Sequence, residues 1–154
     1  MSTNQTSNSE FMVVTPKLLT KLLMEHAENS EAVLIEGPPG CGKTEITCQI
    51  SAKVGKPMLS PFNVALSDGT DMKGIPSFND GKTSQHWVKD KRWIEAAQFP
   101  QTILLDELGQ GSTSAINACA SIIHEKRIDD VFLHPETWVV ATSNRAQDLS
   151  LIHI

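Results

Sequence analysis

The sequence predicts one α/β domain in which a largely parallel sheet carries helices on both faces. Short apolar segments alternate with segments of helical periodicity along the 154 residues, as is typical of such a sheet. A glycine-rich turn joins the first apolar segment to a helix, and two later apolar segments end in acidic or amide residues. Because ligands bind at the carboxyl ends of strands in open parallel sheets, these ends predict a binding site at one sheet edge.

The composition narrows the class of protein. The 13 basic and 18 acidic residues give a net charge of −5, which disfavours a dedicated nucleic-acid binder. Cys41, Cys48 and Cys119 lack zinc-site spacing and are typical of reduced thiols. No apolar run approaches the about 20 residues of a membrane helix, and residues 1–11 are a polar tail that we expect to be disordered. We therefore expect a cytoplasmic protein with no membrane segment.

The first expected element is a helix over residues 15–30. Thr15 can cap its N-terminus, and Pro16 suits the first turn because the N–H that proline lacks has no helical partner there. One apolar stripe along this helix comprises Leu18, Leu19, Leu22 and Leu23.

The next segments predict a strand, a turn and a helix. Residues 32–36 are apolar and predict a short buried strand, and the following helix runs from 43 to about 54, where Gly55 ends it. A second strand begins within residues 56–66. Residues 67–87 are loop-like, and their sequence Asn-Asp-Gly-Lys can turn a hairpin.

The rest of the chain alternates between helices and strands. Ser112 or Thr113 can cap the second of these helices. The expected elements are a helix at 89–99, a strand at 102–109, a helix at 112–127 and a strand at 137–144.

The glycine-rich turn matches the pattern G-x-x-x-x-G-K-[ST], in which backbone N–H groups surround phosphate oxygens. Lys43 can reach the β- and γ-phosphates of a nucleotide, and the Thr44 hydroxyl can ligate Mg²⁺. Cys41 fits a variable loop position better than a catalytic thiol. We name this segment the phosphate loop, and we expect all of its residues to contact nucleotide: Gly37, Pro38, Pro39, Gly40, Cys41, Gly42, Lys43 and Thr44.

Two further strand ends carry candidate site residues. Asp106 and Glu107 end the apolar segment Thr-Ile-Leu-Leu, so Asp106 suits the shell of Mg²⁺ and Glu107 suits activation of a water. Asn144 ends the next apolar strand and can place that water, with Thr142 and Ser143 as alternatives. A carboxylate placed to activate water favours a hydrolase over a kinase, which must exclude water.

With these stretches identified, the chain resembles the AAA+ ATPases over about residues 12–148. GPPGCGKT resembles their Walker A motif, ILLDEL their Walker B motif and VVATSNR their sensor-1 strand. SDGTDMKGIPSFNDGKTSQHWVKD is similar to the D-x-x-D-x-x-G-x-P stretch of the MoxR-like, dynein-related branch. The resemblance thus places an AAA+ nucleotide-binding core at 12–148.

The resemblance implies binding of ATP with Mg²⁺ and ATP hydrolysis, coupled to remodelling of a protein partner. Lys43, Glu107 and Asn144 would be catalytic, and Thr44 and Asp106 would hold the metal. The family implies a homo-oligomeric ring, often a hexamer, and partners that often carry a von Willebrand A domain. Neither nucleic acid nor a membrane is implied as a partner.

The resemblance to the family stops near residue 148. Relatives continue with another strand, an arginine finger and a helical lid, so we expect this sequence to be an incomplete core. Codons for residues 149–154 can match a sequencing-adapter sequence, and we interpret this segment as non-native, the alternative being a natural apolar strand. Because an arginine finger contributes about 10³–10⁵ in rate, we expect slow hydrolysis without one.

Three other functions remain open from the sequence. A nucleotide-binding switch with negligible turnover would share the phosphate loop but would not need Glu107. A nucleic-acid motor or loader would need basic residues, for which only DMKGIP and KDKR are candidates. A small-molecule kinase would release a phosphorylated acceptor instead of free phosphate.

Overall fold

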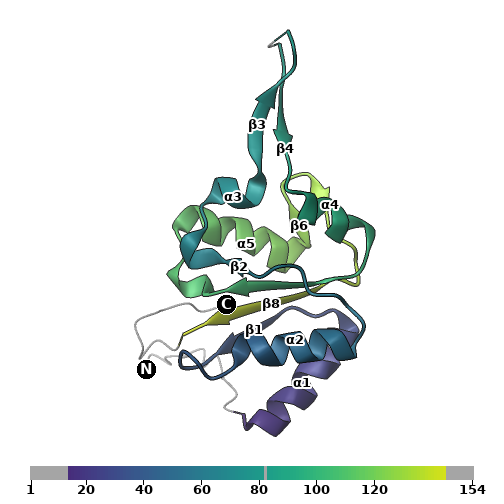
Figure 1. The fold of residues 1–154 in the computed structure, drawn as a ribbon, viewed down its shortest axis with the longest axis vertical. Coiled ribbons are helices and arrows are strands. Elements are labelled where there is room, and N and C mark those ends of the chain that lie inside the picture. The colour runs from purple at the N-terminus through teal and green to yellow at the C-terminus, as the bar shows by residue number, and fades with distance from the viewer. Residues whose placement is uncertain (1–13, 82, 145–154) are drawn as a thin grey trace, which may run out of the picture.

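The computed structural model describes residues 14–81 and 83–144. The predicted tail at 1–11 and the segment 149–154 lie outside these residues. The described chain forms a four-stranded parallel sheet between two layers of helices, which confirms the predicted fold class (Figure 1).

The order of the strands in this sheet is β1-β8-β5-β2. The strand predicted at 32–36 is β1, and it lies at one edge, where Ile35 is the one buried residue of the strand. The strand predicted at 56–66 shrinks to β2, because Pro57 and Pro61 have no N–H to donate to a neighbouring strand. The strands are β1 (Val33–Glu36), β2 (Phe62–Asn63), β5 (Thr102–Asp106) and β8 (Trp138–Ser143).

The two central strands bury both of their faces. Successive side chains of a strand point to opposite faces, so β5 and β8 supply two separate hydrophobic clusters. Leu104 and Val140 belong to the cluster beneath α1 and α2, whereas Ile103, Leu105 and Val139 pack under α4 and α5 on the opposite face. This double burial explains why the central residues of both strands, 103–105 and 138–141, are apolar.

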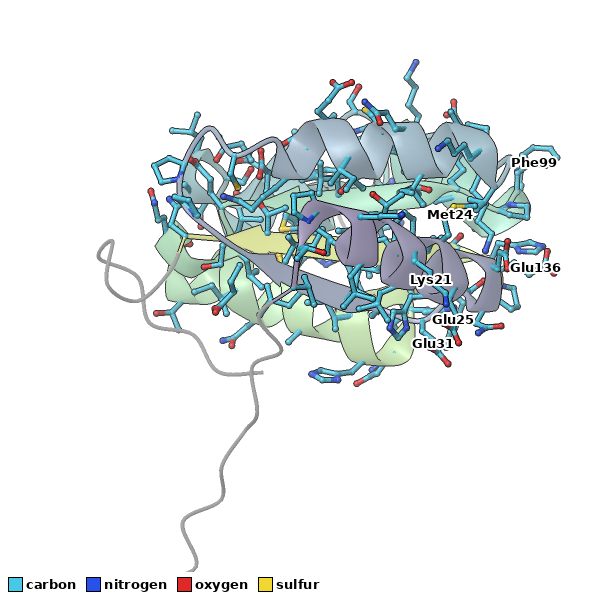
Figure 2. The ribbon with its side chains drawn as sticks, turned by 90° about the horizontal axis from the view of Figure 1, so that it is seen from below. Lys21, Met24, Glu25, Glu31, Phe99 and Glu136 are labelled. Atoms are coloured by element: carbon cyan, nitrogen blue, oxygen red, sulfur yellow. The ribbon has the colours of Figure 1, made fainter. Side chains whose placement is uncertain are left out.

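Two helices cover one face of the sheet: α1 (Pro16–Asn29) and α2 (Lys43–Lys53). The predicted cap of α1 is confirmed, since the Leu18 N–H donates to the Thr15 hydroxyl. The predicted leucine stripe is wrong at Leu18, which is 42% exposed. The buried face keeps Leu23 of that stripe and continues to Ala27, one helical turn further along. Lys21 and Glu25 extend from the outer side of α1 (Figure 2).

The helices α4 (Lys91–Gln98) and α5 (Thr113–Glu125) cover the opposite face. Ser112 caps α5, as predicted, by accepting a hydrogen bond from the Ala115 N–H. Trp93 of α4 is fully buried and stacks on Phe62 of β2 with 4.6 Å between ring centroids. The indole N–H of Trp93 donates to the main-chain oxygen of Met72, so the buried polar atom is paired.

The loop predicted at 67–87 contains regular structure. A capping box between Asp68 and Asp71 starts a short helix, and a hairpin then projects away from the sheet (Figure 1). The predicted hairpin is therefore confirmed by the pairing of its strands, whereas the loop-like character predicted for the rest of the segment is wrong where α3 forms. These elements are α3 (Gly69–Lys73), β3 (Ile75–Phe78) and β4 (Gln85–Val88).

Several short elements were not predicted from the sequence. The pair β6–β7 is antiparallel and lies between α5 and β8, and each of its strands has only two residues, too few to show a periodic pattern. Across the described ranges, no helix is long and apolar enough to cross a membrane. The short elements are η1 (Val64–Leu66), η2 (Leu108–Gln110), β6 (Arg127–Ile128) and β7 (Val131–Phe132).

Candidate functional site

The phosphate loop connects the end of β1 to the start of α2. Gly40 and Gly42 have φ angles of 75° and 86°, in the left-handed region that glycine adopts without a steric cost. No side chain of the described residues caps α2, so the first N–H groups of that helix remain for another acceptor. A helix start of this kind attracts anions, because its N–H groups and its dipole both present positive charge.

Lys43 begins α2 and folds back across the loop. Its Nζ donates hydrogen bonds to the main-chain oxygens of Gly37 at 2.9 Å and Pro38 at 3.1 Å. It also lies 3.4 Å from Oδ1 of Asn144, just beyond the end of β8. The structure therefore brings together two predicted site residues that are far apart in the sequence.

Thr44 and Asp106 form a second contact between predicted residues. The Thr44 hydroxyl lies 3.4 Å from Oδ2 of Asp106, at the carboxyl end of β5. Hydroxyl and carboxylate oxygens are suitable donors for Mg²⁺. Within the described ranges, no cluster of three or more His, Cys, Asp or Glu could hold a metal ion. This donor set fits a Mg²⁺ that also takes ligands from phosphate and water.

Glu107 follows β5 in a left-handed conformation, with φ 56° and ψ 39°. This conformation costs a residue other than glycine about 1–3 kcal/mol, so its surroundings must stabilise it. The Glu107 N–H donates to the Thr142 hydroxyl oxygen at 3.2 Å, and the Thr142 hydroxyl donates in turn to the Asp106 carboxylate. The backbone of Glu107 and the side chain of Asp106 thus share one hydrogen-bond partner.

Thr142 and Ser143 were the predicted alternatives to Asn144 for placing a water, but both of their hydroxyls donate to protein oxygens. The Thr142 hydroxyl points to Asp106, and the Ser143 hydroxyl donates to the main-chain oxygen of Asn144. The alternation of side chains along a strand could have predicted a role for Thr142 beside Asn144, because residues two apart on a strand share one face. Thr142 contacts Asp106, and Asn144, just beyond the end of β8, contacts Lys43.

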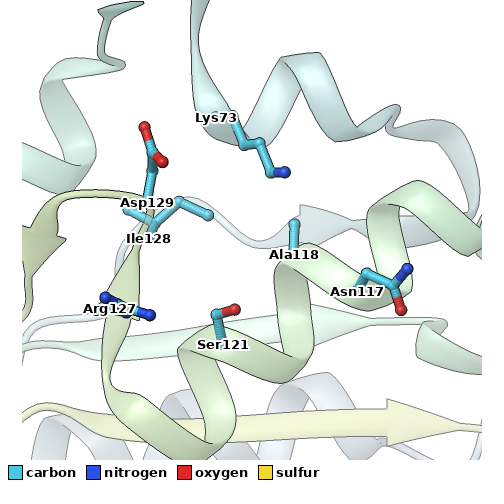
Figure 3. A pocket seen from close by; sticks show the side chains of 7 residues that line it. All are labelled: Lys73, Asn117, Ala118, Ser121, Arg127, Ile128 and Asp129. Atoms are coloured by element: carbon cyan, nitrogen blue, oxygen red, sulfur yellow. The ribbon is translucent and has the colours of Figure 1, made fainter.

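A cavity of about 400 Å³ lies elsewhere, between α3, α5 and β6 (Figure 3). Lys73, Asn117, Ser121 and Arg127 contribute its polar lining. None of its lining residues belongs to the predicted site, and its side chains are largely paired or exposed; Arg127, for example, forms an ion pair with Glu125 at 2.6 Å. The cavity therefore adds nothing to the chemistry of the phosphate loop.

The sequence matches one family model, that of the AAA domain (dynein-related subfamily), over residues 32–152. This range contains the phosphate loop, both acidic residues and the end of β8. No curated protein matches the sequence significantly.

Several solved structures share the fold. A protein from Cytophaga hutchinsonii aligns with a TM-score of 0.56 and 21% identity, over 92% of this chain and 42% of its own. A variant of RuvB from Thermotoga maritima gives a TM-score of 0.58 and 20% identity, over 87% and 40%. NtrX from Brucella abortus gives 0.59 and 14%, over 94% and 34%. The chain thus spans about two fifths or less of each of these structures.

Proposed function

Because this chain belongs to the dynein-related subfamily of AAA domains, we propose that it binds ATP with Mg²⁺ and hydrolyses it. One observation carries the proposal: the phosphate loop meets two other strand ends through the pairs Lys43–Asn144 and Thr44–Asp106, each 3.4 Å apart. These contacts would not be expected if the glycine-rich turn had no function and matched the phosphate-loop pattern by chance.

Each residue then has a distinct part in the proposed reaction. The N–H groups of the phosphate loop and the Lys43 ammonium bind the phosphates, and Lys43 exchanges its main-chain acceptors for phosphate oxygens. Thr44 and Asp106 hold Mg²⁺, whose charge would offset the negative charge of the phosphates. Glu107 accepts a proton from the attacking water, and Asn144 orients that water.

We further propose that the intact protein works in a homo-oligomeric ring in the cytoplasm and remodels a protein partner. Family membership supports this proposal, and a partner with a von Willebrand A domain remains part of it. Sedimentation with and without Mg²⁺ and ATP tests assembly on the longest available gene product. A monomer under every condition would contradict the ring.

Replacing Lys43 tests the phosphate loop directly. We expect Lys43→Ala to weaken binding of a fluorescent ATP analogue at least about tenfold, because it removes the charge-assisted hydrogen bonds that the half-buried Lys43 ammonium would donate to phosphate oxygens. Lys53→Ala is the matched control, since Lys53 lies exposed in the last turn of the same helix. Equal loss of binding in both variants would contradict the proposed site.

A sensitive assay for free phosphate separates the proposal from its rivals. Tight Mg²⁺-dependent binding with no phosphate release would favour a nucleotide switch, and transfer to an acceptor would favour a kinase. Stimulation by DNA that weakens with salt would favour a nucleic-acid motor. RuvB of Thermotoga maritima is described as a Holliday junction branch migration motor, but its 18% identity to this chain supports a shared fold alone.

A further inference from the structure

We propose that Thr142 is a positioning residue, which holds Asp106 and Glu107 in the arrangement that Mg²⁺-dependent binding of ATP requires. This inference rests on the proposed function. It also differs from the sequence prediction, which considered Thr142 only as an alternative to Asn144 for placing water.

The Thr142 hydroxyl makes two hydrogen bonds at the centre of the site. It donates its proton to Oδ1 of Asp106 and accepts the Glu107 N–H at 3.2 Å. A hydroxyl has a single proton to donate, so the bond to Asp106 fixes its orientation and leaves a lone pair for Glu107. With Oδ1 engaged, Oδ2 of Asp106 is the oxygen that faces the Thr44 hydroxyl, 3.4 Å away.

The position of Thr142 is itself rigid. β8 pairs with β1 on one side and β5 on the other, and Thr142 lies opposite Ile35 in the register with β1. Its side chain is fully buried, and a β-branched side chain has a restricted χ1 angle. The hydroxyl is therefore held by the sheet and not by a mobile loop.

The two residues that Thr142 contacts both need such a support. Glu107 occupies the left-handed region, where a residue with a Cβ atom is strained, and its N–H bond to Thr142 restrains that turn. Asp106 must present one oxygen toward Thr44. Partners that orient a metal ligand typically change metal affinity 10–100-fold when they are removed.

Five variants of the full chain test the inference. Thr142→Val removes the hydroxyl and nearly keeps the shape, whereas Thr142→Ser keeps the hydroxyl. Thr137→Val is the matched control, because Thr137 is equally buried and its hydroxyl has no partner among the described residues. Asp106→Asn alone and combined with Thr142→Val shows whether Thr142 acts through Asp106.

Three quantities are measured for each variant: the thermal melting temperature, the affinity for a fluorescent ATP analogue in EDTA, and the Mg²⁺ concentration that gives half of the metal-dependent gain in affinity. We expect Thr142→Val to keep the affinity in EDTA and to need about 10–100-fold more Mg²⁺ for the same gain in affinity. Thr142→Ser should restore most of the metal response, and Thr137→Val should leave it unchanged. In the Asp106→Asn background, Thr142→Val should have no further effect.

Other outcomes overturn the inference. A folded Thr142→Val protein with a metal response within twofold of wild type would do so, and so would a Thr142→Ser protein that is equally impaired. If Thr142→Val does not fold, Thr142→Ala makes the same comparison without overpacking. If the wild-type chain shows no metal-dependent nucleotide binding, the proposed function fails, and the inference fails with it. If the wild-type chain does show this binding, an unchanged metal response in Thr142→Val contradicts the role of Thr142 alone and leaves the proposed function standing.

Discussion

Glu107 shows how the site depends on single residues. Its sequence position after an apolar strand predicts a carboxylate at the sheet edge, and the structure adds a left-handed backbone conformation there. Thr142 restrains that conformation from the neighbouring strand. A contact across the sheet thus restrains the backbone of Glu107, whose carboxylate is the group that we propose activates water.

Replacing Glu107 by glutamine keeps the size of the side chain and removes its basicity. We expect Glu107→Gln to bind ATP like wild type and to release phosphate about 10²–10⁴-fold more slowly, the usual contribution of a general base. Glu28→Gln, at an exposed position of α1, is the control. Equal phosphate release by the wild type and Glu107→Gln would show that Glu107 does not activate water.

At the scale of elements, α4 shows how one cap connects a helix to the sheet. Asp90 accepts the Arg92 backbone N–H at 2.9 Å and forms an ion pair with the Arg92 side chain at 2.6 Å. The guanidinium of Arg92 lies 4.0 Å from the ring centroid of Phe62, which stacks on Trp93. The cap therefore orients a cation over the aromatic pair that anchors β2.

The ion pair of α4 predicts a dependence of stability on pH. The hydrogen bond from Arg92 lowers the pKa of Asp90, so the carboxylate contributes fully above the ordinary pKa of about 3.9 and loses that contribution as pH falls through its lower folded pKa. We expect Asp90→Asn to keep the cap and lose up to about 1 kcal/mol at pH 7. Urea denaturation at pH 7 and near pH 3 should show that the difference in free energy of unfolding between wild type and Asp90→Asn is smaller in acid.

The control for this prediction is Glu95→Gln, at an exposed position of the same helix. It should change the free energy of unfolding little at either pH. A difference between wild type and Asp90→Asn that stays constant down to pH 3 would show that the ion pair does not contribute.

At the scale of the whole molecule, the hairpin β3–β4 stands apart from the central sheet and its two layers of helices. Ile75 and Phe78 are 71% and 60% exposed, and the hairpin projects from the α3 side of the molecule (Figure 1). Its base is fixed by Lys89, which forms ion pairs with Asp129 and Asp130 at 2.5 and 2.8 Å. The core and the phosphate loop therefore depend little on the hairpin.

Deleting the hairpin tests this independence. We expect replacement of residues 75–88 by a short Gly-Ser linker to change the free energy of unfolding by no more than about 1 kcal/mol, because few buried contacts are lost. ATP binding should also persist. Trp93→Ala, which empties a fully buried site, should cost about 3–5 kcal/mol in the same urea assay. Loss of cooperative unfolding in the deletion variant would show that the hairpin belongs to the core.

The sequence alone determined the features that depend on neighbouring residues. The caps at Thr15 and Ser112, the glycine turn of the phosphate loop and the polar strand ends were predicted from short local patterns. The hairpin strands were not, because both of their faces are exposed and no alternation of apolar and polar residues marks them.

Only the tertiary structure decided which strand ends meet. The order β1-β8-β5-β2 puts β8 beside both the phosphate loop strand and the acidic strand. This order lets Asn144 reach Lys43 and lets Thr142 reach Asp106, across large separations in the sequence. Residue types at strand ends can predict that a site exists. Which side chains touch depends on the order of the strands in the sheet. That order follows from tertiary packing, in which the apolar strands β5 and β8 take the central positions and bury both of their faces.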